Sequence, residues 1–389
     1  MSESPLDPNI PQPELEMAGP QGLGTTAEAL PTAIRKPIGL ALQGGGSLGA
    51  YTWGVLDTLL GSRSLTIAQL SGTSAGALNA AIVASALAKG TPADARKALA
   101  SFWRRLAQPA MADLGRDLWG PLERAWRETI HGWLVTGSAL SPYTANPLGL
   151  NPLRDAISAH VDIDAIRSRT APALFVTVTN VRTGLPRVIG NDAMTLDVLL
   201  ASAALPQLFQ AVEIDGEPYW DGGYSGNPTL WPMIHSGAAR DLIVVQLVPD
   251  IDLEPPTDAR AIRRRIGEIV FNSSLVAEMQ SIAATRALTR EGDGAAGVRE
   301  VRMHRIGPPG RDLLAQGSSL ERSRAWIDRL HESGRLAARN FGQRHGADIG
   351  VRETLDVGRV FGGAHKPKLR RPANDGAFDG APLPATAAG

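Results

Sequence analysis

Short apolar segments of β-strand composition alternate with helical segments from Pro37 onward, and this alternation limits the chain to few folds. The clearest strand predictions are residues 38–43, 65–70, 173–181 and 242–248. Strands that alternate with helices are typical of βαβ units, which build a mainly parallel sheet covered by helices. With 389 residues, the chain is long enough for one such domain of about 300 residues and two terminal segments. We therefore expect an α/β fold.

Changes in composition predict the domain boundaries. Residues 1–36 are rich in Pro, Glu, Gly and Thr and lack the charged start and apolar stretch of a secretory signal, so we expect a disordered leader. The folded domain is expected over residues 37–345, followed by a flexible tail over 346–389 that becomes rich in Pro, Ala and Gly. Within the domain, residues 97–150 have helical patterning without a strand and are interpreted as a helical insertion.

Charge and cysteine content exclude several classes of partner. The 39 Lys and Arg residues balance the 39 Asp and Glu residues, so no net charge attracts a polyanion and we expect no nucleic-acid partner. The chain has no cysteine, which excludes disulfides and thiolate metal ligands. The longest apolar runs, such as 80–88 and 242–248, are far shorter than the roughly 20 residues that span a bilayer. We expect a cytoplasmic protein, either soluble or peripheral at membranes.

A glycine-rich segment follows the first predicted strand. Gly44, Gly46 and Gly49 fit the G-x-G-x-x-G pattern of dinucleotide-binding loops, which also requires an acidic residue about 20 positions later. No acidic residue lies between Asp57 and Asp94, so the nucleotide interpretation fails, and the P-loop interpretation fails because no Lys-Ser or Lys-Thr pair follows. Glycines at a helix N-terminus expose backbone N–H groups that bind anions. A simple tight turn is the alternative, and this segment alone leaves both open.

The second motif is Gly-Thr-Ser-Ala-Gly at residues 72–76, a G-x-S-x-G pattern centred on Ser74. Small residues allow the strained strand-to-helix turn that exposes a nucleophilic serine at its tip. The context fits, because the pattern follows the predicted strand at 65–70 and precedes an Ala-rich helical segment at 75–89. Ser74 is therefore the candidate nucleophile.

A serine nucleophile needs a base, and a Ser-Asp-His order would be expected in an α/β-hydrolase. The seven histidines are scattered, and none lies in a glycine-rich loop after a strand. Asp221 begins an Asp-Gly-Gly segment at 221–223 and has aromatic neighbours at 219, 220 and 224. Shielding by these rings would raise the pKa of its carboxyl group and favour a role as base, whereas an ordinary turn aspartate is the alternative.

Taken together, residues 44–49, 72–76 and 221–223 resemble the patatin-like phospholipase family in order and spacing. The resemblance covers roughly residues 37–250 and includes the segment 201–206, Ala-Ser-Ala-Ala-Leu-Pro, which is similar to the proline-ended helix of that family. It implies a three-layer α/β/α sandwich with a mainly parallel central sheet. It also implies a serine that works with an aspartate and without a histidine.

The resemblance assigns roles to residues of this sequence. Ser74 would be the nucleophile and Asp221 the base. Backbone amides would form the oxyanion hole at Gly44, Gly45, Gly46 and Ser47, and the motifs would be supported by Gly49, Gly72, Gly76, Gly222 and Gly223. One position departs from the family, because many members carry Arg or Lys where this chain has Leu48, so a charged contribution to the oxyanion hole is not expected.

The implied function is a serine acyl hydrolase that cleaves carboxylic ester bonds of lipids, as a phospholipase A or lipid acyl hydrolase, through an acyl-enzyme intermediate. No metal or organic cofactor is required. Two alternatives remain open: an esterase for neutral lipid or aliphatic polyester, and a catalytically silent lipid-binding protein on the same fold.

Two further segments bear on lipid contact. Trp119, Trp126 and Trp133 recur at every seventh residue of the predicted insertion, so on a helix they form one apolar stripe. The stripe is interpreted either as core, which is usual for buried aromatics, or as a lid over the entrance for lipid. The basic residues of the tail segment 366–371 predict a weak, salt-sensitive attraction to anionic lipid surfaces.

Overall fold

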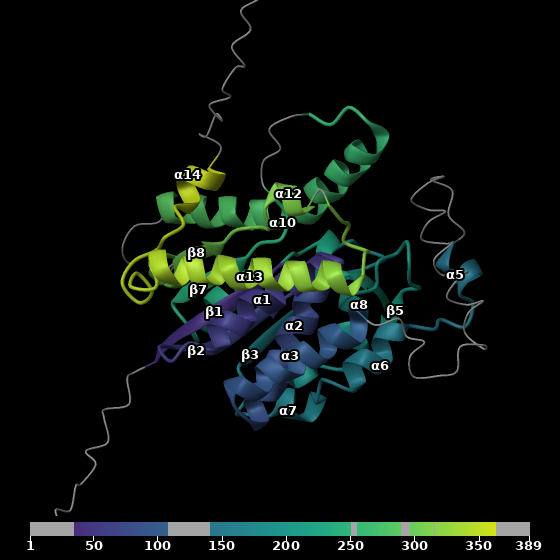
Figure 1. Cartoon of the computed structure of the whole chain (residues 1–389), viewed down its shortest axis with the longest axis horizontal. Helices are drawn as coiled ribbons and strands as arrows, with labels where there is room; N and C mark the ends of the chain where they lie inside the picture. The colour runs from purple at the N-terminus through teal and green to yellow at the C-terminus, as the bar shows by residue number, and fades with distance from the viewer. Residues whose placement is uncertain (1–34, 108–140, 250–254, 289–295, 315, 363–389) are drawn as a thin grey trace, which may run out of the picture. The chain divides into compact units, whose positions relative to one another are not determined.

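The computed structural model describes residues 35–107, 141–249, 255–288, 296–314 and 316–362. These residues form one mixed sheet of eight strands in the order β5-β6-β3-β2-β1-β7-β8, with β4 paired to β3 (Figure 1). The strands are β1 (Lys36–Leu42), β2 (Leu65–Gly72), β3 (Ala173–Asn180), β4 (Pro186–Ile189), β5 (Val212–Ile214), β6 (Glu217–Asp221), β7 (Asp241–Val245) and β8 (Arg302–Ile306). Strands β3, β2, β1, β7 and β8 run parallel to one another, whereas β4, β5 and β6 pair antiparallel.

Helices cover both faces of this sheet. The longer helices are α1 (Gly49–Leu60), α2 (Ala75–Lys89), α3 (Pro92–Ala107), α10 (Ala259–Leu288) and α13 (Arg324–His345). The shorter ones are α5 (Pro142–Ala145), α6 (Pro152–Ser158), α7 (Ile163–Arg167), α8 (Leu196–Ser202), α9 (Trp231–Ser236), α11 (Ala296–Glu300), α12 (Arg311–Leu314) and α14 (Val357–Phe361). Single 3₁₀ turns are η1 (Gly46–Leu48), η3 (Asn191–Ala193) and η4 (Gly222–Tyr224). The three-layer α/β/α arrangement predicted from the sequence is confirmed.

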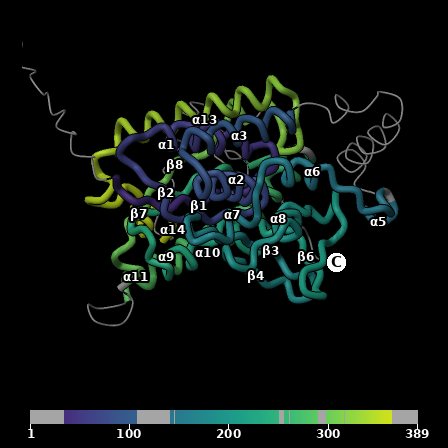
Figure 2. The backbone as a smooth tube through the Cα atoms, turned by 90° about the horizontal axis from the view of Figure 1, so that it is seen from below, coloured from purple at the N-terminus to yellow at the C-terminus, as the bar shows by residue number. Residues whose placement is uncertain are grey.

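The central strands are apolar on both sides because each side packs against helices. In β1, Leu40 and Leu42 join a core cluster with residues of α1, α2, α3 and α13. Ala41, which points to the opposite face, joins a second cluster with residues of α9, α10 and α14. Figure 2 shows α1 and α13 on one side of the strands and α9 and α10 on the other. The sheet therefore separates two hydrophobic layers.

The start of the predicted insertion at 97–150 differs from expectation. Helix α3 begins earlier, at Pro92, after Thr91 and Asp94 exchange hydrogen bonds in a capping box. Its residues Phe102 and Trp103 are buried in the main core, so the part of the predicted insertion up to residue 107 packs with the rest of the domain. The stripe of Trp119, Trp126 and Trp133 lies outside the described residues, as do residues 1–34 of the predicted leader and the basic tail segment, whereas Lys36 already belongs to β1.

The predicted flexible tail also starts later than residue 346. Residues 346–362 are packed on the domain, and Leu355, Val357 and Phe361 belong to the second hydrophobic cluster. The backbone amides of Thr354 and Leu355 both donate to the carbonyl of Met303 in β8. A few apolar side chains among charged residues and glycines indicate a packed segment only weakly. This is why the sequence predicted the start of the tail too early. Among the described residues, no helix is long and apolar enough to cross a membrane.

Candidate functional site

Ser74 lies at the tip of a sharp turn between β2 and α2. Its backbone has φ 54° and ψ −127°, a strained conformation for a residue with a side chain. Glycine is required on both sides, because a Cβ at Gly72 would lie 2.5 Å from the carbonyl oxygen of Gly76 and a Cβ at Gly76 would overlap the carbonyl of Leu42. The amide of Ser74 donates to the hydroxyl of Ser202 at 3.0 Å, which fixes the turn against α8. Residues 72–76 therefore form the sharp strand-to-helix turn that the G-x-S-x-G pattern predicts, with Ser74 at its tip. We call this turn the serine elbow.

Asp221 is the last residue of β6 and is completely buried. Its Oδ1 accepts a hydrogen bond from the amide of Gly223 at 2.7 Å, and its backbone carbonyl accepts one from the hydroxyl of Thr179 at 2.8 Å. Burial raises the pKa of the carboxyl group to about 7, and the bond from Gly223 and the hydroxyl of Ser74 act in the opposite direction. The carboxylate is thus held rigidly and titrates near neutral pH.

The sheet topology brings Ser74 and Asp221 together although 147 positions separate them. Strand β3 pairs with β2 on one side and with β6 on the other, where Val178 is the partner of Asp221. A Cβ placed on Gly222 would come within 2.9 Å of the Thr73 side chain, so the Asp-Gly-Gly turn packs directly on the serine elbow. Both predicted residues therefore belong to one site.

The side chains of Ser74 and Asp221 approach each other without a well-aligned hydrogen bond. The Ser74 hydroxyl is close enough to lower the pKa of Asp221. However, Oδ2 of Asp221 is buried without a partner that meets hydrogen-bond geometry among the described residues. Catalytic hydrogen bonds often align well only once substrate is bound, so this geometry is compatible with a role for the pair. Oδ2 is thus an open acceptor beside the serine.

The glycine-rich segment 44–49, called the glycine loop here, follows β1 and packs against the serine elbow. A Cβ at Gly44 would lie 2.8 Å from the Cβ of Ser74, so only glycine allows this approach. Two of the four predicted oxyanion donors are already used: the amide of Gly44 donates to Oδ1 of Asn227 at 2.6 Å, and the amide of Ser47 donates to the carbonyl of Ser319 at 2.7 Å. The amides of Gly45 and Gly46 donate to no acceptor in the described part of the chain. The donor set is therefore smaller than the sequence predicts.

The other motif glycines serve close packing. A Cβ at Gly49 would lie 2.7 Å from the Cβ of Ala75 and 3.0 Å from the Trp103 ring, which brings the starts of α1 and α2 together. A Cβ at Gly223 would overlap the ring of Phe271 in α10. These glycines hold the three motifs within contact distance of one another.

Comparison with known proteins agrees with this geometry. The profile of the family described as patatin-like phospholipase matches residues 40–234, which span the glycine loop, the serine elbow and the Asp-Gly-Gly turn. The chain belongs to the patatin-like phospholipase family. This family acts on lipid substrates, and membership indicates a lipid acyl hydrolase. Among solved structures, VipD from Legionella pneumophila is similar at 15% identity and a TM-score of 0.39, over 80% of this chain and 67% of VipD. None of the curated proteins compared with the chain matches it.

The histidines of this patatin-like chain are bound elsewhere. His304 is buried in the middle of β8, where its ring nitrogens contact Asp241 at 3.0 Å and Thr354 at 2.9 Å. His331 stacks on Trp53 with ring centroids 3.7 Å apart. The described histidines at 160, 235 and 345 contact Ser101, Trp231 and Asp348, respectively. Among the described residues, no histidine is hydrogen-bonded to the candidate nucleophile or base.

Sequence reasoning missed a group of buried amides behind the glycine loop. Asn227 accepts from the amide of Gly44 and donates through Nδ2 to the carbonyl of Phe271 at 2.9 Å. Gln43 donates to Oδ1 of Asn272 at 3.0 Å and accepts from the amides of Leu247 and Val248. The available signal was Asn-Pro at 227–228, shortly after Asp-Gly-Gly, but such a dipeptide normally indicates only a turn. The patatin motifs are thus anchored to β7 and α10.

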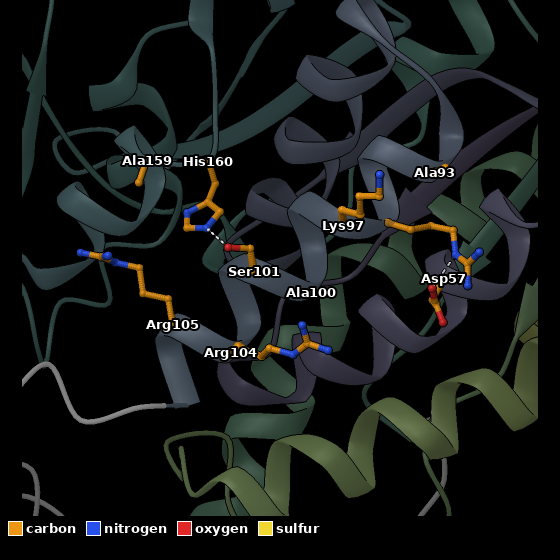
Figure 3. Close-up of a pocket in the computed structure, with 10 residues that line it drawn as sticks. Asp57, Ala93, Lys97, Ala100, Ser101, Arg104, Arg105, Ala159 and His160 are labelled. Atoms are coloured by element: carbon orange, nitrogen blue, oxygen red, sulfur yellow. Dashed lines mark hydrogen bonds and ion pairs between the residues drawn. The ribbon is translucent and has the colours of Figure 1, made fainter. Parts of the chain in front are cut away.

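A surface groove along α3 lies apart from the candidate site. A groove of about 850 Å³ runs along α3 and is lined mainly by polar and basic residues (Figure 3). Its wall includes Lys97, Arg104 and Arg105, and the hydrogen bond of 2.9 Å between His160 and Ser101 lies within it. Neither Ser74 nor Asp221 lines this groove. The candidate site is therefore defined by the geometry of the three motifs, and this groove is not part of it.

Proposed function

We propose that this patatin-like protein hydrolyses carboxylic ester bonds of lipids, as a phospholipase A or lipid acyl hydrolase, with Ser74 and Asp221 as a catalytic dyad. The observation that carries the proposal is the buried carboxylate of Asp221, whose Oδ2 lacks a partner among the described residues and lies beside a strained serine. Its pKa of about 7 suits a general base at neutral pH, because a base works best when its pKa is near the operating pH.

In the first half-reaction, the Oγ of Ser74 attacks the ester carbonyl carbon while Asp221 takes the hydroxyl proton. The carbonyl π electrons move to oxygen, and the amides of Gly45 and Gly46 stabilise this oxyanion. The intermediate collapses, the bond to the alcohol breaks, and Asp221 returns the proton to the leaving alkoxide. The product is an acyl group on Ser74.

In the second half-reaction, Asp221 removes a proton from a water molecule, which attacks the acyl carbon. The same two amides stabilise the second oxyanion. The bond to Ser74 then breaks, and the proton passes from Asp221 to the serine oxygen. One ester bond and one water give one carboxylic acid and one alcohol, and no cofactor takes part.

Covalent labelling tests the proposal directly. A fluorophosphonate probe should label the wild-type chain at Ser74 and release its leaving group, whereas Ser74→Ala should remain unlabelled and lose ester hydrolysis. Alanine is a suitable replacement because the small residue fits the elbow, and unchanged circular dichroism would exclude unfolding. Labelling at another residue, or retained hydrolysis by Ser74→Ala, would contradict the dyad. A folded wild type without label or turnover would favour the silent lipid-binding alternative.

A hydrolysis assay on three kinds of ester substrate would determine the substrate class. We expect phospholipid vesicles to be hydrolysed faster than triacylglycerol emulsions and aliphatic polyester oligomers at equal ester concentration. Mass spectrometry of the released fatty acids measures all three reactions in the same way. Faster hydrolysis of the emulsion or of the polyester would replace the phospholipase proposal by the esterase alternative.

A further inference from the structure

The first part of α10 exposes an apolar stripe. Ile262, Ile266 and Ile269 are 40%, 56% and 54% exposed, and Val270 is 38% exposed. Spacings of four, three and one place these side chains on one side of the helix. In Figure 1 the first turns of α10 extend away from the sheet, unlike its second half, which packs on the strands. Single exposed aliphatic residues are ordinary, but four that share one helix face form a patch.

Basic side chains border this stripe. Residues 259–270 contain four arginines, at 260, 263, 264 and 265, and one acidic residue, Glu268. Helical spacing places Arg263 and Arg265 at the two edges of the stripe and Arg264 on the far side, and Arg264 and Arg265 pair with Glu268 at 3.6 Å and 3.1 Å. Arg263 is exposed and follows the first isoleucine of the stripe. The segment is therefore an amphipathic helix with an apolar face, basic flanks and an excess of positive charge.

The helix that carries the stripe packs on the candidate active site through its opposite side. Phe271 directly follows Val270, and its ring meets the ring of Tyr224 edge to face at a centroid distance of 5.2 Å. The same ring contacts Gly223, which donates the hydrogen bond to Asp221. Helix α10 therefore joins the turn that carries Asp221, on its inner side, to the exposed stripe on its outer side.

We infer that the stripe of Ile262, Ile266, Ile269 and Val270 docks this protein on the surface of an anionic phospholipid bilayer, an inference that rests on the proposed function. An apolar helix face with basic flanks matches such a surface, because the aliphatic side chains enter the acyl boundary while the arginines contact phosphate groups. A second copy of the chain would bring its own arginines against these arginines. Charge complementarity therefore favours the lipid surface as the occupant.

Vesicle co-sedimentation of the full chain tests the inference. Vesicles of phosphatidylcholine with a minority of phosphatidylglycerol should bind the wild type, and the double variant Ile262→Gln/Ile266→Gln should bind about 10-fold to 100-fold more weakly, since two half-exposed isoleucines no longer transfer into lipid. Leu336→Gln is the matched control, because Leu336 in α13 has an exposed fraction of 54%, close to that of Ile266. The control variant should bind as the wild type does. Arg263→Gln should weaken binding several-fold to anionic vesicles and not to pure phosphatidylcholine.

The outcomes separate this inference from the proposed function. Binding can be measured in the Ser74→Ala background, so it does not depend on turnover, and hydrolysis of a short soluble ester reports on the dyad alone. Equal vesicle binding by the wild type and the double variant, or no binding by the wild type, would overturn the docking surface while leaving the hydrolase in place. A wild-type dimer that the double variant converts to a monomer, with vesicle binding unchanged, would assign the stripe to self-association and also overturn it.

Discussion

Replacement of Asp221 by Asn should abolish hydrolysis and, above neutral pH, make the protein more stable. Asp221 is completely buried, and burial raises the pKa of its carboxyl group from 3.8 to about 7. A carboxyl group with a higher pKa in the folded protein than in the unfolded chain holds its proton more tightly when folded. Its deprotonation therefore destabilises the fold as the pH rises from about 4 through about 7.

The magnitude follows from this pKa. One pKa unit corresponds to about 1.4 kcal/mol, so the rise from 3.8 to about 7 corresponds to roughly 4 kcal/mol of destabilisation above pH 7. Asparagine avoids this cost, but its Nδ2 replaces Oδ2, which has no hydrogen-bond partner among the described residues. A buried donor without an acceptor costs about 1–3 kcal/mol. We expect Asp221→Asn to be about 1–3 kcal/mol more stable than the wild type above pH 7, and less stable by a similar amount below pH 4.

Urea unfolding at about pH 4 and about pH 8 measures the difference in the free energy of unfolding between the two proteins, which should change by about 4 kcal/mol between these conditions. In parallel, kcat/KM of the wild type should rise with pH through the same pKa and then level off, because Asp221 acts as a base only when deprotonated. A difference in stability that does not depend on pH would refute the reasoning. So would an activity that falls as the pH rises through 7.

Two further predictions concern the neighbours of the dyad. His304→Gln and His331→Gln should keep kcat per folded molecule within about tenfold of wild type, although both variants lose stability. A decrease in kcat of about 10³-fold or more at either position would instead indicate that a histidine acts as the base. Gly45→Ala should reduce kcat more than it raises KM, because its added Cβ comes no closer than 3.2 Å to Leu247 and disturbs mainly the amide donor. Gly46→Ala should instead lower the melting temperature, because Gly46 has φ +59° and its Cβ would overlap the carbonyl of Ser319. Equal effects of the two substitutions on melting would contradict this distinction.

Local sequence signals were sufficient for the α/β fold and for the helix that follows the serine elbow. The helix predicted at 75–89 is observed as Ala75–Lys89, because an unbroken Ala-rich segment begins directly at the serine elbow. The strand predicted at 65–70 is observed as β2, Leu65–Gly72. Ser74 and Asp221 remain candidates, and each lies in a short motif whose glycines are required by close contacts with other residues.

Long-range partners could not be read from the sequence. The segment that accepts from Ser47, at Ser318 and Ser319, lies about 270 positions away, and nothing in its composition indicates a partner in the glycine loop. The number of free backbone amides in the glycine loop was therefore overestimated. The local sequence does not show whether an amide is free or already bonded to a distant carbonyl. The same limitation placed the start of the tail too early, since the burial of Leu355 and Phe361 depends on packing against α10.

The buried amide of Asn227 shows how such distant contacts bear on catalysis. It joins the first amide of the glycine loop, at Gly44, to the carbonyl of Phe271 in α10. Its loss would free the loop to shift relative to the serine, and a displacement of about 1 Å can cost about 10²-fold in rate. Gln69 is a matched control, because it is equally buried and bonded to the Ala239 carbonyl at 3.3 Å but contacts no motif. If Asn227 positions the loop, Asn227→Ala should lower kcat about 100-fold with little change in KM, whereas Gln69→Ala should lower the melting temperature and keep kcat per folded molecule. Equal kcat values for the two variants would contradict a positioning role for Asn227 and leave it with a structural role only.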